Sequence, residues 1–410
     1  MRRPVGVLLL LVLAAVGVAV LTVPWNVLPG GHPVVEVTRD FSASELSRER
    51  AFHHALRPPA YAALVVSVLV AGLLGLTPLG ARLVNRLPGP WWLRVPWATA
   101  VVVLLGQAAT LPLDVRSELV LRRYGLSTQD WTGWADDLLR GLAVKVLTSS
   151  LVLLVLVATA RRAPRTWWIG GAGAAAALVA VGSFAYPLVV EPAFNHFSSL
   201  PAGELRTDLL ALAAKDHVPV TDVLVADASR RTTALNAYVS GFGSTRRIVL
   251  YDTLLRQSPR REVELVVAHE LGHAKRQDVL HGTLIGALGA GAGVCGLFVL
   301  LTRGPLLRRC GAGSAADPAV VPLVLLLALV TPLLLLPVTS LVSRHIEGRA
   351  DVHALDLTRD VPTFIASERR LSVGNLSDLR PGRLVYGLFF DHPSGPQRIA
   401  VARAWQRLHP

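Results

Sequence analysis

The chain has 410 residues, of which 52% are hydrophobic and only 17% charged, and its mean hydropathy is +0.48. This composition is too apolar for an ordinary soluble protein and indicates a membrane protein. The formal net charge is +13, but the basic residues are dispersed without an aromatic-and-basic binding motif, so we expect no nucleic-acid partner. With only two cysteines, the chain cannot build a disulfide framework or a thiolate-rich metal site.

Several segments are long and apolar enough to cross a bilayer, whose core requires about 20 mainly apolar residues per helix. They cover residues 5–23, 60–79, 95–113, 142–160, 166–190, 280–302 and 319–342. The first could be a signal peptide, but no small-residue cleavage site follows it before Pro24, which favours a retained anchor. The sequence therefore predicts a predominantly α, multi-pass protein of the cell membrane with seven spans.

Two polar stretches, residues 191–279 and 343–410, each follow an odd-numbered span and should therefore lie on the same face of the membrane. Together they provide about 155 residues, enough for one packed lobe. We accordingly divide the chain into an N-terminal membrane region, 1–190, and a C-terminal domain, 191–410, which includes the last two spans. Within the lobe we expect helices at 203–215 and 259–277 and short strands at 222–226 and 247–251.

The expected helix 259–277 carries the pattern His269-Glu270-Leu271-Gly272-His273. Two imidazoles four residues apart project from one face of a helix, one turn apart, and can reach a single ion. Zinc suits such a site because it accepts imidazole and carboxylate ligands and takes three protein ligands plus water in catalytic sites. We therefore expect one Zn²⁺ per chain, held by His269 and His273. The alternative is an exposed polar helix end without a metal.

A third ligand is needed, and no third histidine follows at the short spacing of the metzincin pattern, so a carboxylate from another helix is expected. Glu347 directly follows the last span, on the face of the membrane where the lobe should lie. His345 and His353 are rival ligands. Glu347 could also form no more than an ion pair with Arg344 or Arg349.

With these ligands in place, zinc would lower the pKa of its bound water toward about 7. Glu270, which is not a ligand, would act as the general base. Asp351, one turn beyond Glu347, would accept the second N–H of a ligating imidazole and fix its tautomer. His392 and Arg398 could supply a further donor to an oxyanion, although each alone is more often a surface residue.

Two stretches before this motif carry a resemblance to a known family: Leu-Asn-Ala-Tyr-Val-Ser-Gly-Phe-Gly at 235–243 and Arg-Arg-Ile-Val-Leu-Tyr-Asp-Thr-Leu-Leu at 246–255. With the Glu-x-x-x-Asp at 347–351, they resemble the type I CAAX prenyl protease family of membrane zinc endopeptidases. The resemblance implies a ring of seven helices around a large chamber, with an α+β, gluzincin-like zinc peptidase lobe on one face.

The resemblance also implies roles for residues outside the metal-binding motifs. The asparagine matching Asn236 binds the substrate backbone from an edge strand, and the residues matching His392 and Arg398 contact the substrate and the tetrahedral intermediate. We therefore expect Glu270 and His392 to be catalytic and Asn236 and Arg398 to bind substrate. The substrate would be a peptide or protein, hydrophobic or lipidated, that is processed at a CaaX-type C-terminus or elsewhere.

Two other readings of the function stay open, as does the orientation in the membrane. One is a quality-control protease of the membrane heat-shock metallopeptidase type, which has fewer spans; the other is a non-catalytic metal-binding membrane protein, in which an intact Glu270 would be unexpected. The rule that basic short loops stay cytoplasmic places the lobe outside the cytoplasm, whereas resemblance to the eukaryotic enzymes places it inside. The basic residues on the face opposite the lobe are Arg2, Arg3, Arg82, Arg86, Arg94, Arg161, Arg162, Arg165, Arg303, Arg308 and Arg309.

Overall fold

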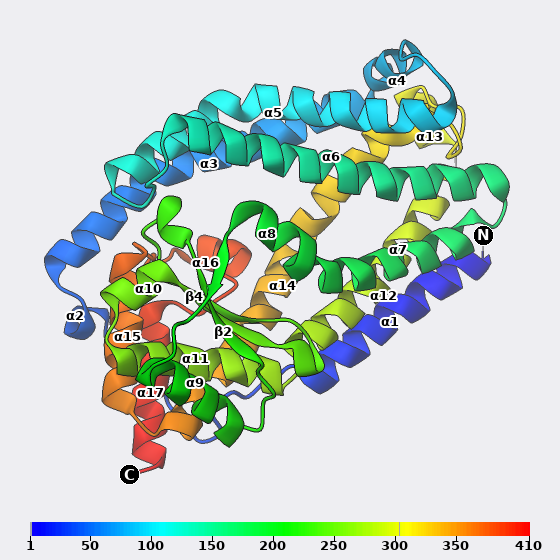
Figure 1. Ribbon diagram of the computed structural model, residues 1–410. Helices are drawn as coiled ribbons and strands as arrows, with labels where there is room; N and C mark the ends of the chain where they lie inside the picture. Colours follow the sequence, from blue (N-terminus) through cyan, green and yellow to red (C-terminus); the bar gives the residue numbers. More distant parts are fainter. Residues whose placement is uncertain (1, 303) are drawn as a thin grey trace.

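The computed structural model describes residues 2–302 and 304–410 and is predominantly helical (Figure 1). In this part of the chain, seven helical segments are long and apolar enough to cross a membrane, which confirms the predicted number of spans. The helices that form them are α1 (Arg2–Thr22), α3 (Ala43–Leu76), α5 (Trp91–Arg123), α6 (Trp131–Arg162), α7 (Trp167–Ala185), α12 (Asp278–Thr302) and α14 (Val321–Thr358).

Several of these helices run well beyond the apolar segments that predicted them. Helix α3 begins at Ala43 instead of residue 60 and ends at Leu76 instead of residue 79, and α14 continues to Thr358 instead of ending at residue 342. An apolar window marks only what can lie in lipid, whereas helical hydrogen bonding continues into polar sequence. Pro58 and Pro59 lie inside α3, where neighbouring helices help such breaks to be tolerated.

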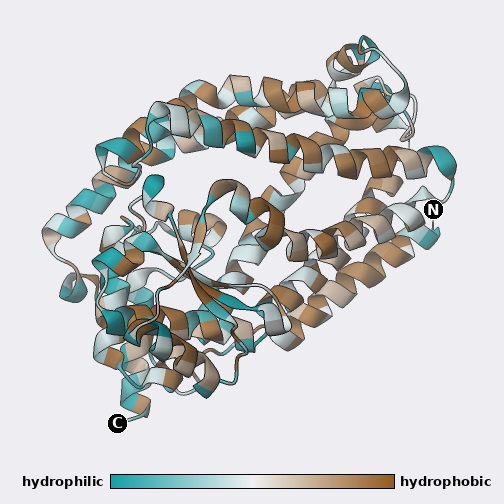
Figure 2. Ribbon diagram, viewed as in Figure 1, coloured by the Kyte–Doolittle hydropathy of each residue, from teal (hydrophilic) through white to brown (hydrophobic). Residues whose placement is uncertain are grey.

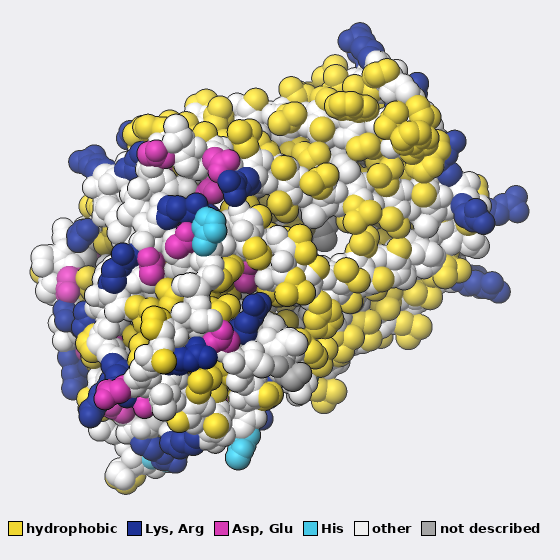
Figure 3. All heavy atoms as spheres, viewed as in Figure 1, with side chains coloured by type: hydrophobic (Ala, Val, Ile, Leu, Met, Phe, Trp, Pro, Cys, Tyr) yellow, Lys and Arg dark blue, Asp and Glu magenta, His cyan; other side chains and the backbone are white. Residues whose placement is uncertain are grey.

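The spanning helices form a ring around a chamber. Neighbours around the ring contact one another in the order α1, α12, α7, α6, α5, α3 and α14, and helix α11 (Arg260–Lys275) contacts both α14 and α12. Figure 3 shows an opening in the membrane part of the molecule that is bordered by hydrophobic side chains. Most residues of the spanning helices are coloured as hydrophobic in Figure 2, as lipid contact requires.

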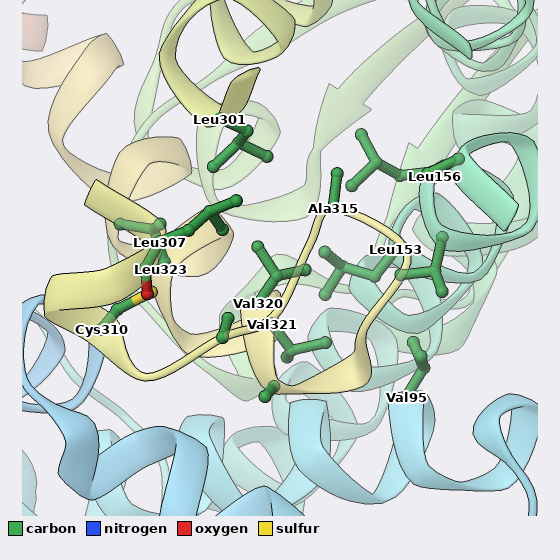
Figure 4. Close-up of a cluster of buried hydrophobic side chains, with 14 of the residues drawn as sticks. Val95, Leu153, Leu156, Leu301, Leu307, Cys310, Ala315, Val320, Val321 and Leu323 are labelled. Carbon is green, nitrogen blue, oxygen red and sulfur yellow. The ribbon is translucent and has the colours of Figure 1, made fainter. Parts of the chain in front are cut away.

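The end of the ring farthest from the lobe has its own hydrophobic core (Figure 4). It packs Val95 of α5, Leu153 of α6 and Val321 of α14 together with residues of the short helices α4 (Pro78–Asn85) and α13 (Pro305–Cys310). Arginines project from this end in Figure 3, in agreement with the predicted concentration of basic residues. Arg303, which we counted among them, lies outside the described residues.

The lobe contains a four-stranded sheet in the order β1-β2-β4-β3. Strands β2 (Asp222–Ala226) and β4 (Arg247–Tyr251) run parallel and confirm the two predicted strands. Strands β1 (Phe197–Ser199) and β3 (Ala237–Ser240) are antiparallel to their neighbours. Local patterning predicted neither, because segments of three and four residues show too little alternation, although the family resemblance implied an edge strand at Asn236.

Helices cover one face of the sheet and form the rest of the lobe. Helix α9 (Glu204–Lys215) and α11 share a core with this face, which confirms the two predicted helices to within two residues at each end. A second core joins α11 to α14, α15 (Val361–Gly374) and α17 (Gly395–Leu408). The remaining helical segments are α2 (Val37–Asp40), η1 (Tyr186–Val190), α8 (Glu191–Phe194), η2 (Ala228–Arg230), η3 (Gly243–Thr245), α10 (Asp252–Gln257), η4 (Pro318–Val320) and α16 (Arg383–Phe389).

Connections that follow odd-numbered spans meet at the lobe, which agrees with the predicted shared face. After the first span, Asp40 forms an ion pair with Arg403 of α17. After the third, Ser127 pairs with Thr232 in an isolated antiparallel bridge. The lobe is thus packed against residues from the N-terminal half of the chain. The division into two domains at residue 190 stays a prediction.

Candidate active site

Two helices from distant parts of the sequence bring together the three predicted metal ligands. Helix α11 carries His269 and His273 one turn apart, and α14 carries Glu347 beyond its apolar part. The Nε2 atom of His269 lies 3.2 Å from Nε2 of His273 and 3.2 Å from Oε2 of Glu347. The Nε2 atom of His273 lies 3.5 Å from Oε1 of Glu347. His269 and Glu347 are almost fully buried.

This donor set fits a single small cation. Tetrahedral zinc with bonds of about 2.0–2.1 Å holds its donor atoms roughly 3.3 Å apart, which is the spacing of these three groups. One ligand atom from each residue lies within 4.8 Å of the other two. Two imidazoles and one carboxylate also match the ligand types of catalytic zinc sites that keep a fourth position for water.

Carboxylates hold the other nitrogen of each imidazole. The Nδ1 atom of His269 lies 3.0 Å from Oδ1 of the fully buried Asp351, as the sequence predicted. The Nδ1 atom of His273 lies 2.9 Å from Oδ2 of Asp278, the first residue of α12. Such partners fix the tautomer so that both Nε2 atoms face the metal position. Sequence reasoning missed Asp278, although its place five residues after His273 was a usable signal.

The rival ligands face elsewhere. His345 approaches the carbonyl of Leu341 in its own helix, and Nε2 of His353 lies 2.9 Å from Asp216. Nor do the neighbouring arginines hold Glu347. Arg344 donates to the carbonyls of Tyr386 and Phe390, whereas Arg349 pairs with Asp278.

Strong interactions shift the pKa values of the ionisable groups on α11. Burial lowers the pKa of His269, but its hydrogen bonds to Asp351 and Glu347 outweigh burial and raise that pKa to about 10. For His273, burial is likewise outweighed by the hydrogen bonds to Asp278 and Glu347, which raise the pKa to about 9. Burial raises the pKa of Glu270 because it penalises the charged carboxylate.

A cavity of about 440 Å³ opens beside these residues, within the usual range for ligand pockets. Glu270 lines it, one position along the helix from His269. His392 also lines it: its Nε2 lies 3.4 Å from Oε2 of Glu347, and its Nδ1 bonds Asp391 at 2.9 Å. The hydrogen bond to Asp391 is the main cause that raises the pKa of His392. Its side chain is 55% exposed, so it stands at the mouth of the cavity.

The two predicted substrate-binding residues line the same cavity but already have partners. Asn236 immediately precedes β3, and its Oδ1 accepts a hydrogen bond from the backbone N–H of Ala237 at 3.0 Å. Arg398 of α17 donates from Nε to both oxygens of Asp351, and its Nη1 lies 2.9 Å from Glu368. Sequence reasoning missed Glu368, a buried acid on α15 that no local pattern marks.

Comparison with known protein families agrees with this geometry. The family model described as "Peptidase family M48" matches residues 199–406. The model described as "CAAX prenyl protease N-terminal, five membrane helices" matches residues 61–196. A crystal structure of S. mikatae Ste24p superposes with a TM-score of 0.80 over 97% of this chain and 98% of that chain. Its sequence identity is 19%, so it shows the likeness of fold.

Sequence relatives are proteases as well. An uncharacterized metalloprotease of Bacillus subtilis, YhfN, is 31% identical over 74% of this chain and 71% of its own length. A CAAX prenyl protease 1 homolog of Oryza sativa is 29% identical over 74% and 71% of the two chains. CAAX prenyl protease 1 of Saccharomyces cerevisiae is 27% identical over 72% and 69%. Taken with the fold and the metal-ligand cluster, these matches show that the chain belongs to peptidase family M48 and is a multi-pass membrane metalloprotease of the CAAX prenyl protease type.

Proposed function

We propose that the protein is a zinc endopeptidase whose metal is held by His269, His273 and Glu347. The observation that carries the proposal is the convergence of the two Nε2 atoms and the carboxylate of Glu347, whose oxygens lie 3.2 Å from His269 and 3.5 Å from His273. When bound, zinc supplies a Lewis acid that acidifies coordinated water and polarises the scissile carbonyl. Asp351 and Asp278 bond the Nδ1 atoms and would thereby leave both Nε2 atoms free to bind the ion.

Glu270 is the general base in this proposal. It lies in the cavity next to the ligand His269 but is not itself one of the three metal donors. A carboxylate whose pKa is raised by burial binds a proton more readily than one in water, and the same group can then deliver that proton to the leaving amine.

His392 stabilises the negative charge that develops on the attacked carbonyl. Its raised pKa favours the protonated ring, which can donate a hydrogen bond to an oxyanion. Its Nε2 lies 3.4 Å from Oε2 of Glu347, a proposed metal ligand, so the ring lies beside the place where the scissile carbonyl would bind. Asp391 orients the ring through Nδ1.

Asn236 and Arg398, which both line the cavity, are proposed to act on the substrate. Asn236 stands at the start of the edge strand β3, where a peptide backbone can pair. Arg398 requires a more restricted role, since Asp351 and Glu368 already occupy its guanidinium. Its guanidinium still lies at the cavity wall, where its positive charge offsets the negative charge that develops on the attacked carbonyl.

The substrate is a peptide or protein, as for other proteases of this family. We propose that it is hydrophobic or lipidated. The apolar residues that border the opening in the membrane part of the molecule support this proposal, because a polar peptide gains little from such a route (Figure 3). Relatives named CAAX prenyl protease 1 support a C-terminal processing reaction.

The test is cleavage of a quenched hydrophobic peptide by the purified full-length protein, wild type beside Glu270→Gln. We expect the variant to lose about 10²–10⁴-fold in kcat while retaining its metal, because only proton transfer is removed. Glu264→Gln on the same helix is the matched control and should cleave normally. A chelator should stop the wild type. Equal rates for wild type and Glu270→Gln would exclude Glu270 as the base.

A further inference from the structure

A second cavity, of about 640 Å³, lies at the junction of the lobe and the membrane helices. We call it the side pocket. Its apolar walls come from the end of α7, from η1, from the segment around β3 and from the start of α12. They include Phe184, Tyr186, Leu188, Tyr238, Phe242 and Val279. None of these residues takes part in the metal site or in the proton transfers described above.

The side pocket borders a strand with a free edge. Strand β3 is the last strand of the sheet, and the carbonyl of Asn236 accepts a hydrogen bond from Tyr251 on the neighbouring strand β4. In an antiparallel pair, only every second residue bonds the partner strand. The backbone groups of Ala237 and Val239 therefore point away from β4, toward the free edge. The N–H of Ala237 donates to Oδ1 of Asn236, so an extended peptide can pair with the carbonyl of Ala237 and with both backbone groups of Val239.

The side chains on the two faces of β3 contact different parts of the molecule. Val239 packs in the core that contains α11, the helix of the metal ligands. Tyr238 packs on the opposite face, and its hydroxyl lies 3.3 Å from Glu191 at the membrane junction. Side chains directly opposite each other in a strand pair share a face. Alternate residues of a peptide added to this edge would therefore point toward α11 and toward the side pocket.

A smaller cavity shares lining residues with both the side pocket and the proposed metal site. That cavity is lined by Glu270 and His273 and also by Phe242 and Val279. Phe242 and Val279 also line the side pocket. A peptide whose scissile bond lies beside Glu270 would thus have a neighbouring residue within reach of this space.

We propose that the side pocket binds a large apolar side chain of an extended peptide substrate paired with β3. The inference rests on the proposed peptidase function and adds a determinant of specificity to it. The rings of Phe184 and Phe242 meet edge to face, with centroids 5.2 Å apart, and join α7 to the segment that follows β3. Leu188 is 68% exposed and leaves a wide apolar surface for the substrate to cover.

The test is a positional scan with quenched peptides in which a single residue is either Ala or Phe. For the purified wild-type protein, we expect kcat/KM to rise about tenfold or more when Phe occupies the position that faces the side pocket. Leu188→Trp narrows the pocket, so the Phe-to-Ala ratio at that position should fall to about one. The ratio compares two peptides in one preparation, so partial misfolding does not change it.

Leu69→Trp is the matched control, since Leu69 is 64% exposed on a membrane helix and does not line the side pocket. This variant should keep the wild-type ratio at every position. The inference is overturned if Leu188→Trp leaves the Phe-to-Ala ratio unchanged at every position, or if it lowers that ratio equally at all positions. Wild-type protein that cleaves none of the peptides, or cleaves them despite a chelator, would instead contradict the proposed peptidase function.

Discussion

The two imidazoles of the proposed metal site differ in how they are held. His269 is buried and has Asp351 behind it, which in turn is bonded by Arg398. His273 is less buried and depends on Asp278, which is paired with Arg349. Each imidazole therefore has a carboxylate behind it, and each carboxylate has an arginine. Buried charges are tolerated when they are paired in this way.

The raised pKa values of both imidazoles predict that metal binding depends on pH. Without metal, His269 and His273 keep protons up to pH values of about 10 and 9, and these protons must leave before the nitrogens can bind a cation. We expect the apparent zinc affinity to rise by about tenfold or more per pH unit between pH 6 and 8. Competition with a chromophoric chelator measures it, and a flat profile would contradict the raised pKa values.

The same shifts predict the opposite trend for the stability of the metal-free fold. A pKa raised in the folded state stabilises that state below the unfolded value of about 6.5, and the gain is lost as pH rises through the folded value. The melting temperature of the chelator-treated protein should therefore fall between pH 6.5 and 10. Zinc-loaded protein, whose imidazoles carry no exchangeable proton on Nε2, should show a smaller change when the two are melted side by side.

Asp278 should matter for metal affinity although no motif marks it. Asp278→Asn removes the charge that supports His273, and loss of such outer partners typically weakens metal binding about 10–100-fold. Equilibrium dialysis against zinc measures the effect. Asp136→Asn is the control, since Asp136 forms an exposed ion pair with Arg140 on α6 away from the site. Equal affinity of the two variants would remove Asp278 from this role.

At the scale of elements, the site depends on the relative position of α11 and α14. Gly272 lets the helices approach, because a Cβ there would meet His353 of α14 at 3.0 Å. Asp216, buried at the end of α9, then joins both helices: Lys275 of α11 lies 2.7 Å from one oxygen and His353 lies 2.9 Å from the other. The carboxylate of Asp216 thus links α11 to α14, two helices that are far apart in the sequence.

Asp216→Asn should therefore weaken metal binding without touching a ligand. The amide lacks the charge that holds Lys275 and His353, so α11 and α14 can shift relative to each other, and we expect up to about a tenfold loss of zinc affinity. Asp222→Asn, which breaks a lobe ion pair with Arg206, is the control for a general loss of stability. If both variants lose stability equally and neither changes zinc affinity, Asp216 serves the fold alone.

In the molecule as a whole, the two ends of the membrane region differ in charge. Arginines project from the end opposite the lobe almost without acidic residues, whereas the lobe carries basic residues together with most of the acidic ones (Figure 3). By the rule for short basic loops, we expect the arginine-rich end to be cytoplasmic and the lobe to lie on the other side. The eukaryotic resemblance predicts the reverse.

Cysteine labelling of intact cells distinguishes the two orientations, because both native cysteines are buried. Asn85→Cys at the arginine-rich end should resist a membrane-impermeant reagent, whereas Glu204→Cys on the lobe should react. Permeabilised cells, in which both should react, are the control. Labelling of Asn85→Cys alone would place the lobe in the cytoplasm.

Local pattern was enough to predict seven apolar spans, a lobe on one face, the helix that carries His269 and His273, and Glu347 as the proposed third ligand. Apolar length and four-residue spacing are properties of a single segment, so they can be read without knowing how segments pack. Predicting Glu347 required one further step of inference, because only the hairpin of the last two spans brings this residue back to His269 and His273.

The groups that surround these residues could be identified only from the folded structure. The bond of Arg398 to Asp351, the support of His273 by Asp278, and the link through Asp216 join residues whose partners no periodicity identifies. The short strand β3 and the side pocket behind it likewise exist only once α7, α12 and the sheet meet. Such contacts depend on the angles and distances at which elements pack, which are set by the whole core rather than by any one segment.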